Sequence, residues 1–80
     1  MGKPADLARF LLKFGYSKEK VHGWLAYHLG RKVELRGIDD LANKTYLALI
    51  HSKPGKGYYY DLLKLWSRIR NFIVFGEDGD

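Results

Sequence analysis

The sequence contains no cysteine and no glutamine, and only one methionine and one threonine among its 80 residues. Without cysteine the chain can form neither a disulfide framework nor a thiolate metal site, and three histidines alone make a poor zinc site. A shortage of thermolabile residues beside many lysine, glutamate, arginine and tyrosine residues is typical of thermophilic proteins. Because so short a domain buries only about 60% of its unfolded surface, its hydrophobic core must stabilise the fold without a covalent or metal cross-link.

Long hydrophobic runs are also missing. No apolar stretch approaches the ~20 residues that span a bilayer, and the N-terminal residues do not resemble a secretory signal. Gly2 does not begin a myristoylation signal, because Asp6 stands where serine or threonine is expected. The sequence therefore predicts a protein of the cytoplasm that does not bind membranes.

Hydrophobic residues make up 46% of the chain and aromatic residues 15%, and the net charge is +5. Each buried aromatic side chain removes roughly 150–250 Å² from water, so this composition supports a folded core. We expect one basic helical domain over residues 1–76 and a flexible acidic tail over residues 77–80. Without that tail, which holds three acidic side chains, fourteen basic residues face six acidic ones and the net charge is about +8.

Apolar residues recur at helical spacing in the first part of the chain and predict two helices. The first is expected over residues 4–14, with Gly15 as a left-handed C-terminal cap. The second begins after Ser17, an expected N-cap, and ends at Gly30. Gly23 inside it costs about 1 kcal/mol relative to alanine, so it either permits close approach of another element or is simply tolerated.

A polar connector over residues 31–37 carries two apolar residues, Val33 and Leu35, that are expected to be buried. Asp39 or Asp40 then caps a third helix, which ends at Lys53-Pro54-Gly55 because the residue before proline is biased away from helix. The residues expected on its buried side are Leu41, Ala42, Thr45, Tyr46, Leu49 and Ile50.

A fourth helix is predicted from Tyr58 to Phe75, with the clearest period of the chain. The residues expected on its buried side are Tyr59, Leu62, Leu63, Trp66, Ile69 and Ile73. The predicted fold class is therefore all-α, a single small domain of about four short helices. The alternative is a winged helix with a β-hairpin at residues 45–60, although residues 47–50 are all apolar and do not alternate as a strand would.

A basic, aromatic and glycine-rich stretch at residues 53–60 is the most distinctive feature of the sequence. Lysine and arginine neutralise phosphates, exposed tyrosines stack on unpaired bases, and the glycines of Gly55-Lys56-Gly57 let backbone N–H groups approach a phosphate. This pattern favours DNA or RNA binding, mainly through the phosphate backbone, although a charged face that is merely solvated is the default alternative. The candidate binding residues are Arg31, Lys32, Arg36, Lys53, Lys56, Tyr58, Tyr60, Lys64, Arg68 and Arg70.

No constellation of residues indicates catalysis, a metal or a cofactor. The three histidines have no nucleophilic partner at a suggestive spacing, and no P-loop pattern is present. The sequence therefore predicts a protein that is not an enzyme. A competing interpretation is a protein-interaction module, an adaptor, an inhibitor or a homodimer, in which Phe72, Ile73, Val74 and Phe75 form the contact surface.

Residues 7–50 resemble the helical module of the GemA-type regulatory proteins of phage Mu. The resemblance rests on Leu11-Leu12, on the segment from Gly15 to His22, and on several leucines that follow. The acidic third helix of that family is replaced here by Asn43-Lys44-Thr45-Tyr46, and residues 53–80 lie outside the match. The resemblance implies a regulatory protein of a virus or mobile element, located in the host cytoplasm if viral, with no catalytic residues to carry over.

Overall fold

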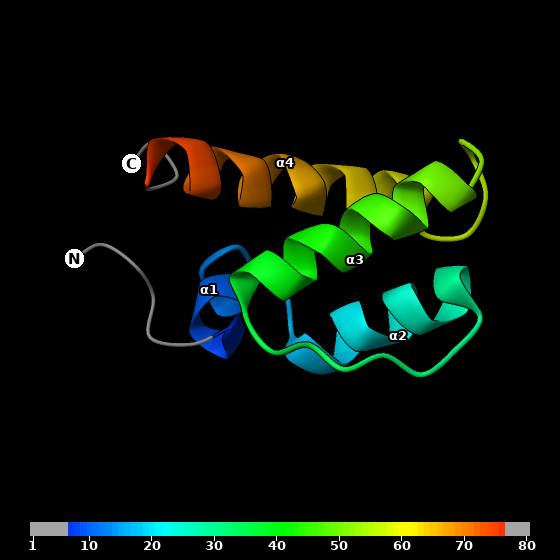
Figure 1. Cartoon of the computed structure of the whole chain (residues 1–80), viewed down its shortest axis with the longest axis horizontal. Helices are drawn as coiled ribbons and strands as arrows, with labels where there is room; N and C mark the ends of the chain where they lie inside the picture. The colour runs from blue at the N-terminus through cyan, green and yellow to red at the C-terminus, as the bar shows by residue number, and fades with distance from the viewer. Residues whose placement is uncertain (1–6, 77–80) are drawn as a thin grey trace.

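The computed structural model describes residues 7–76, which form four α-helices and no strand (Figure 1). The helices are α1 (Leu7–Lys13), α2 (Lys18–Leu29), α3 (Ile38–His51) and α4 (Tyr59–Phe75). The predicted all-α class is confirmed, and the hairpin alternative is wrong because most of residues 45–60 lie in α3 and α4. The expected tail at 77–80 and the expected helix start at Pro4 lie outside the described residues.

The corner between α1 and α2 is built by the two predicted caps. Gly15 has a φ of 86°, and the backbone N–H of Tyr16 donates to the carbonyl of Leu11 at 3.0 Å, the bond that defines a Schellman ending. The hydroxyl of Ser17, two residues after Gly15, accepts a hydrogen bond from the backbone N–H of Lys20 at 3.0 Å. One intervening turn therefore both ends α1 and starts α2.

The connector after α2 is held against α3 by a charged pair. The ammonium of Lys44 donates to the carboxylate of Asp40 at 3.0 Å and to the carbonyl of Glu34 at 2.6 Å. The same carboxylate accepts the backbone N–H of Arg36 at 2.9 Å. The Arg36 backbone bond, with Lys44 next in effect, lowers the pKa of Asp40 below its ordinary value.

The predicted cap of α3 was wrong. Gly37 occupies the N-cap position without a side-chain hydrogen bond, and the helix begins at Ile38. Asp40 lies inside the helix, where its carboxylate accepts the backbone N–H of Arg36 in the connector and the ammonium of Lys44 one turn later in α3. The predicted burial of Val33 and Leu35 is confirmed, since each is 7% exposed.

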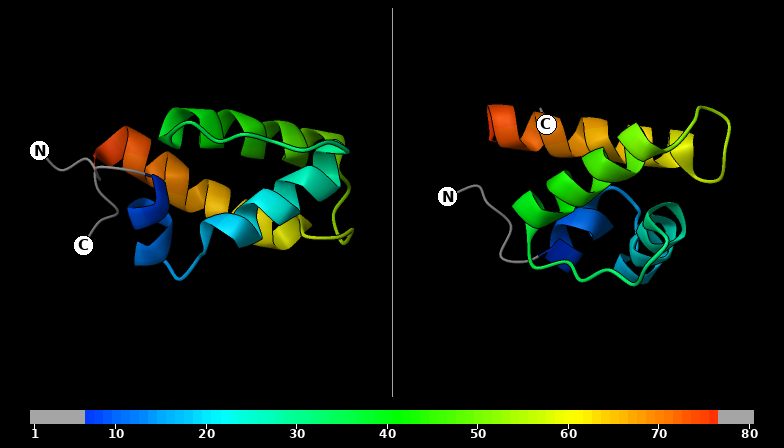
Figure 2. Two further views of the ribbon diagram at one scale, coloured as in Figure 1. Left: turned by 90° about the horizontal axis from the view of Figure 1, so that it is seen from below. Right: turned by 45° about the vertical axis from the view of Figure 1, so that its right-hand side comes forward.

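α3 packs against both α2 and α4 (Figures 1 and 2). Its buried residues are Leu41, Ala42, Thr45 and Ala48, and those of α4 are Leu62, Leu65, Ile69 and Phe72. α1 packs against the C-terminal part of α4, where the rings of Phe10 and Phe72 lie at a centroid distance of 5.1 Å. Within residues 7–76, no helix has both the length and the apolar character needed to cross a membrane.

The predicted buried faces of α3 and α4 were partly wrong. On α3, Tyr46 and Ile50 are more than half exposed. On α4, Leu63 and Ile73 are exposed, while Leu65 and Phe72 are buried. Apolar side chains cover a wider part of each helix than the neighbouring helices bury. The sequence period alone therefore does not determine which of these side chains face the core.

Candidate nucleic-acid interface

All eight basic residues predicted to bind nucleic acid have exposed side chains. They are Arg31, Lys32, Arg36, Lys53, Lys56, Lys64, Arg68 and Arg70. Exposure is necessary for phosphate contact, but it does not by itself gather these residues into one site. The grooves of the surface show which of them lie together.

The first groove, here called the α1–α4 groove, runs between the end of α1 and the outer side of α4 and has a volume of about 440 Å³. Its lining residues are Phe14, Tyr16, Lys64, Ser67, Arg68 and Asn71. The four residues from α4 follow the i, i+3, i+4, i+7 spacing of one helix face. The sequence predicted Lys64 and Arg68 as binding residues, but it did not predict the contribution of the α1–α2 corner.

Two cations lie close to one aromatic ring of the α1–α4 groove, that of Phe14. The guanidinium of Arg68 lies 5.1 Å from the ring centroid of Phe14, and the ammonium of Lys13 lies 5.7 Å from the same ring. Burial raises the pKa of Tyr16, an effect that the nearby Arg68 opposes. The Tyr16 hydroxyl is thus protonated at neutral pH and can donate a hydrogen bond to a ligand in the groove.

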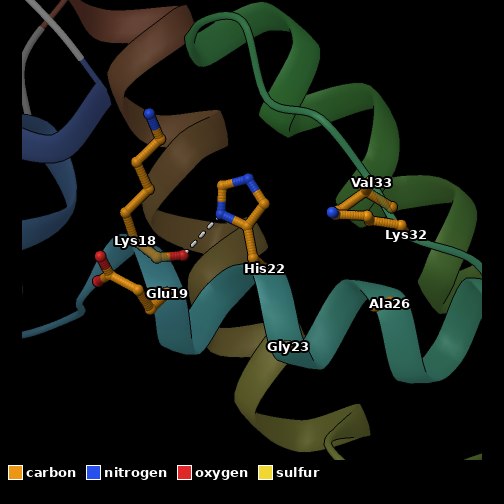
Figure 3. A pocket seen from close by; sticks show the side chains of 7 residues that line it. All are labelled: Lys18, Glu19, His22, Gly23, Ala26, Lys32 and Val33. Carbon is orange, nitrogen blue, oxygen red and sulfur yellow. Dashed lines mark hydrogen bonds between the residues drawn. The ribbon is translucent and has the colours of Figure 1, made fainter.

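The second groove, here called the α2–connector groove, has a volume of about 560 Å³ and lies between one face of α2 and the start of the connector (Figure 3). Its lining residues are Lys18, Glu19, His22, Gly23, Ala26, Lys32 and Val33. His22 Nδ1 lies 2.8 Å from the carbonyl oxygen of Lys18. Because a carbonyl only accepts, Nδ1 carries the proton, and Nε2 is the nitrogen left for another partner.

The α1–α2 corner belongs to both grooves. Tyr16 lines the α1–α4 groove, and Lys18, only two residues further along the chain, lines the α2–connector groove. The two grooves share no lining residue, so Lys32 belongs to one groove and Lys64 and Arg68 to the other. Neither Lys18 nor His22 was predicted as a binding residue, because the groove that they line is completed by Lys32 and Val33 of the connector, which only the tertiary structure brings beside them.

The loop of residues 53–57 lies at the other end of α2, away from the corner (Figure 1). Its two ends are hydrogen-bonded to one histidine of α2. The backbone N–H of Tyr58 donates to His28 Nε2 at 2.9 Å, and His28 Nδ1 lies 2.7 Å from the Ser52 hydroxyl. Since Nε2 accepts, Nδ1 must carry the proton, and the Ser52 hydroxyl in turn donates to the Ala48 carbonyl at 2.5 Å.

The two predicted stacking tyrosines have different surroundings. The ring of Tyr58 stacks on Trp24 at a centroid distance of 5.7 Å and meets Tyr27 edge-on at 5.5 Å. Tyr60 is 57% exposed and precedes Lys64 by one helical turn. Tyr60 therefore shares a helix face with the α1–α4 groove, whereas Tyr58 contributes to an aromatic cluster of the fold.

The remaining predicted residues are not gathered at the corner. Arg31 directly follows Gly30, the C-cap of α2, and therefore lies at the opposite end of α2 from the corner. The Arg36 guanidinium is 3.8 Å from the carboxylate of Glu34, and both side chains are about four-fifths exposed. Arg70, two positions after Arg68, points about 200° around the helix from it.

The predicted protein-contact run at the end of α4 is divided by the fold. Phe72 belongs to the core, whereas Ile73, Val74 and Phe75 are 49%, 60% and 74% exposed. Among residues 7–76, no three His, Asp or Glu side chains are close enough to hold a metal ion. A comparison of the chain with protein-family models, with curated proteins and with solved structures finds no match.

Proposed function

We propose that this domain binds nucleic acid mainly through backbone phosphates, with the α1–α4 groove as the centre of the interface. The observation that carries the proposal is that Lys64 and Arg68 line one groove together with Tyr16, Ser67 and Asn71. Two cations can neutralise successive phosphates, while the hydroxyl and amide groups supply hydrogen bonds to phosphate or sugar oxygens.

Two further features support this function. Tyr60 is exposed one turn before Lys64, so its ring is available to a base next to a bound phosphate. The excess of basic residues outside the C-terminal segment adds a field that draws polyanions to the surface. Arg31, Lys32, Arg36, Lys53, Lys56 and Arg70 contribute to that field, and a regulatory role in a virus or mobile element is the biological setting that the sequence resemblance suggests.

The test is fluorescence anisotropy of labelled oligonucleotides titrated with the protein across a series of salt concentrations. We expect log K to fall linearly with log salt, with a slope of about −0.7 to −0.9 per neutralised phosphate. Lys64→Ala should weaken binding and reduce the slope by about one. Lys20→Ala is the matched control, because Lys20 is an exposed lysine of α2 that lines neither groove. No binding by the wild-type domain at low salt would reject the proposal.

A second candidate function is protein interaction through the outer surface of α3 and α4. Its supporting observation is a group of exposed apolar side chains on these two helices, which includes Tyr46, Ile50, Leu63 and Ile73. Tyr46 contacts the half-buried Trp66 at a ring distance of 5.7 Å, and tyrosine and tryptophan are frequent interface anchors. Sedimentation equilibrium tests self-association, which Ile73→Asp should abolish, and a monomer at all concentrations would remove the homodimer.

A further inference from the structure

Gly23 is the only glycine inside any of the four described helices, and the fold gives no reason for it. A Cβ built at Gly23 meets no heavy atom within 4 Å, and its φ is not positive. By contrast, Gly15, Gly30, Gly55, Gly57 and Gly76 all have positive φ values, which glycine adopts without strain. Gly23 therefore weakens α2 without serving a turn or a contact within the described residues.

The missing side chain of Gly23 opens onto the α2–connector groove. Gly23 and Ala26 lie on the α2 side, and Val33 stands across from them on the connector (Figure 3). These three residues form a small apolar surface, to which Gly23 and Ala26 contribute more than the largely buried Val33. A flat molecule could approach the helix backbone closely at this point.

Charged groups surround that apolar surface. Lys18 lies at the start of α2, and the Lys32 side chain extends from the connector toward the ring of His22, which stands between the two lysines (Figure 3). Glu19 also lines the groove, so the two lysines leave it with a net positive charge. A ligand that suits this groove has a flat apolar part and at least one negative charge.

We infer that the α2–connector groove receives one unstacked nucleotide of the bound strand. The base lies on Gly23, Ala26 and Val33, and the adjoining phosphates are neutralised by Lys18 and Lys32. His22 Nε2 is available for a hydrogen bond to the base, because Nδ1 is occupied by the Lys18 carbonyl. This inference rests on the proposed function, and it makes the ligand class single-stranded DNA or RNA.

The route of the strand supports the single-stranded class. Residues of the α1–α2 corner line both grooves: Tyr16 lines the α1–α4 groove, and Lys18, two residues further along the chain, lines the α2–connector groove. A strand that follows the corner bends around the protein and presents its bases one at a time. A flexible single strand can do so, whereas a duplex keeps its bases paired and cannot place one against Gly23 without base flipping.

The experiment compares wild type, Gly23→Ala, Gly23→Leu and the control Lys20→Ala. Each variant is measured for melting temperature and for affinity toward one labelled oligonucleotide as a single strand, as a duplex, and as a single strand with abasic sites. Gly23→Ala should raise Tm by about 4–8 °C, because alanine is the better helix former. It should nevertheless weaken single-strand binding several-fold, and Gly23→Leu should weaken it at least about tenfold by filling the groove.

The outcomes separate this inference from the proposed function. If Gly23→Ala and Gly23→Leu keep wild-type affinity, the inference is overturned and phosphate binding at the α1–α4 groove stands. Equal affinity for duplex or for the abasic strand would also overturn it, since no base would then occupy the groove. A fall in Tm for Gly23→Ala would show that the fold requires this glycine. Absence of wild-type binding to every probe would overturn both.

Discussion

Gly57 and Gly23 represent two opposite kinds of surface in this domain. A Cβ on Gly57 would lie 2.5 Å from Cε2 of Tyr27 and 3.0 Å from Nε2 of His28, whereas a Cβ on Gly23 would meet nothing within 4 Å. Gly57 is needed because the chain closes tightly around it. Gly23 is not needed by any contact among the described residues. The comparison separates a closely packed contact at one end of α2, here called the joint and formed by Gly57, Tyr27 and His28, from an open groove along the side of α2.

The packing at the joint argues against the simplest interpretation of the 53–57 loop, that of a phosphate-binding loop. Its lysines and glycines are typical of a phosphate-binding loop, yet the residues at its two ends are bonded to His28 and its flank is packed among aromatic rings. A loop with fixed ends presents its lysines in a limited range of positions. The charges remain exposed, but the backbone N–H of Tyr58 already donates a hydrogen bond to His28.

The largest expected effect comes from Gly57→Ala. The substitution forces a non-glycine residue to a φ of 53° and brings its methyl group against Tyr27 and His28. Left-handed backbone strain and overpacking together should lower the free energy of unfolding by about 2–4 kcal/mol. Urea denaturation followed by tryptophan fluorescence measures this, since Trp24 stacks on the adjacent Tyr58.

Gly55→Ala is the matched control for that experiment. Gly55 has a φ of 87° but no neighbouring atom within 4 Å of a built Cβ. It should therefore show the backbone cost alone, about 1–2 kcal/mol. Equal destabilisation by the two substitutions would mean that the contacts with Tyr27 and His28 do not restrict position 57, and the joint would be looser than described.

The next effect is expected from His28→Ala. The substitution removes the acceptor of the Tyr58 N–H and the partner of the Ser52 hydroxyl. With each hydrogen bond contributing about 0.5–1.5 kcal/mol, the loss should be about 1–3 kcal/mol. His51→Ala provides the comparison, because His51 is an exposed histidine at the end of α3. If both variants unfold at the same urea concentration, His28 does not hold the loop.

A smaller effect is expected from pH, through the same histidine. Burial lowers the pKa of His28, and its Nε2 must stay unprotonated to accept the Tyr58 N–H. The unfolded chain, with a pKa near 6.5, then binds more protons than the folded one. Stability should be complete above that value and decline as pH falls toward the lower folded pKa, by at most ~1.4 kcal/mol per pH unit for one proton.

Urea titrations of wild type and His28→Ala at a series of pH values measure this dependence. The difference between the two proteins should shrink as the pH is lowered below about 6.5. Asp40 acts in a separate window, because its lowered pKa gives a contribution that is lost only in more acidic solution, below its ordinary value of 3.8. A difference that stays constant from neutral pH to pH values well below 6 would show that protonation leaves the joint intact.

The sequence predicted the ends of the helices better than their rotation. Gly15, Ser17 and Gly30 are local signals, and all three act as predicted. The buried side of α4 depends on how far α3 and α1 cover it, which no local pattern records. The same reason explains the site, because Lys64 and Arg68 follow from the period of α4, whereas Phe14 and Tyr16 join them only through tertiary packing.

The smallest effect on stability is expected when Lys53 and Lys56 are replaced together by alanine. Both side chains are exposed, so the free energy of unfolding should change by less than about 0.5 kcal/mol. Lys64→Ala with Arg68→Ala removes the same charge from the α1–α4 groove, although Arg68 also packs on Phe14. Anisotropy at low salt compares the affinities of the two double variants for one oligonucleotide.

Equal charge loss makes this pair of variants informative. Long-range attraction falls by the same amount in both, so any difference in affinity comes from direct contacts. Because the groove combines its cations with a hydroxyl and an amide, its double variant should lose more affinity and more of the salt slope. If the loop variant loses more, the interface centres on residues 53–57 despite their fixed ends, and the joint at Gly57 would be part of the binding surface.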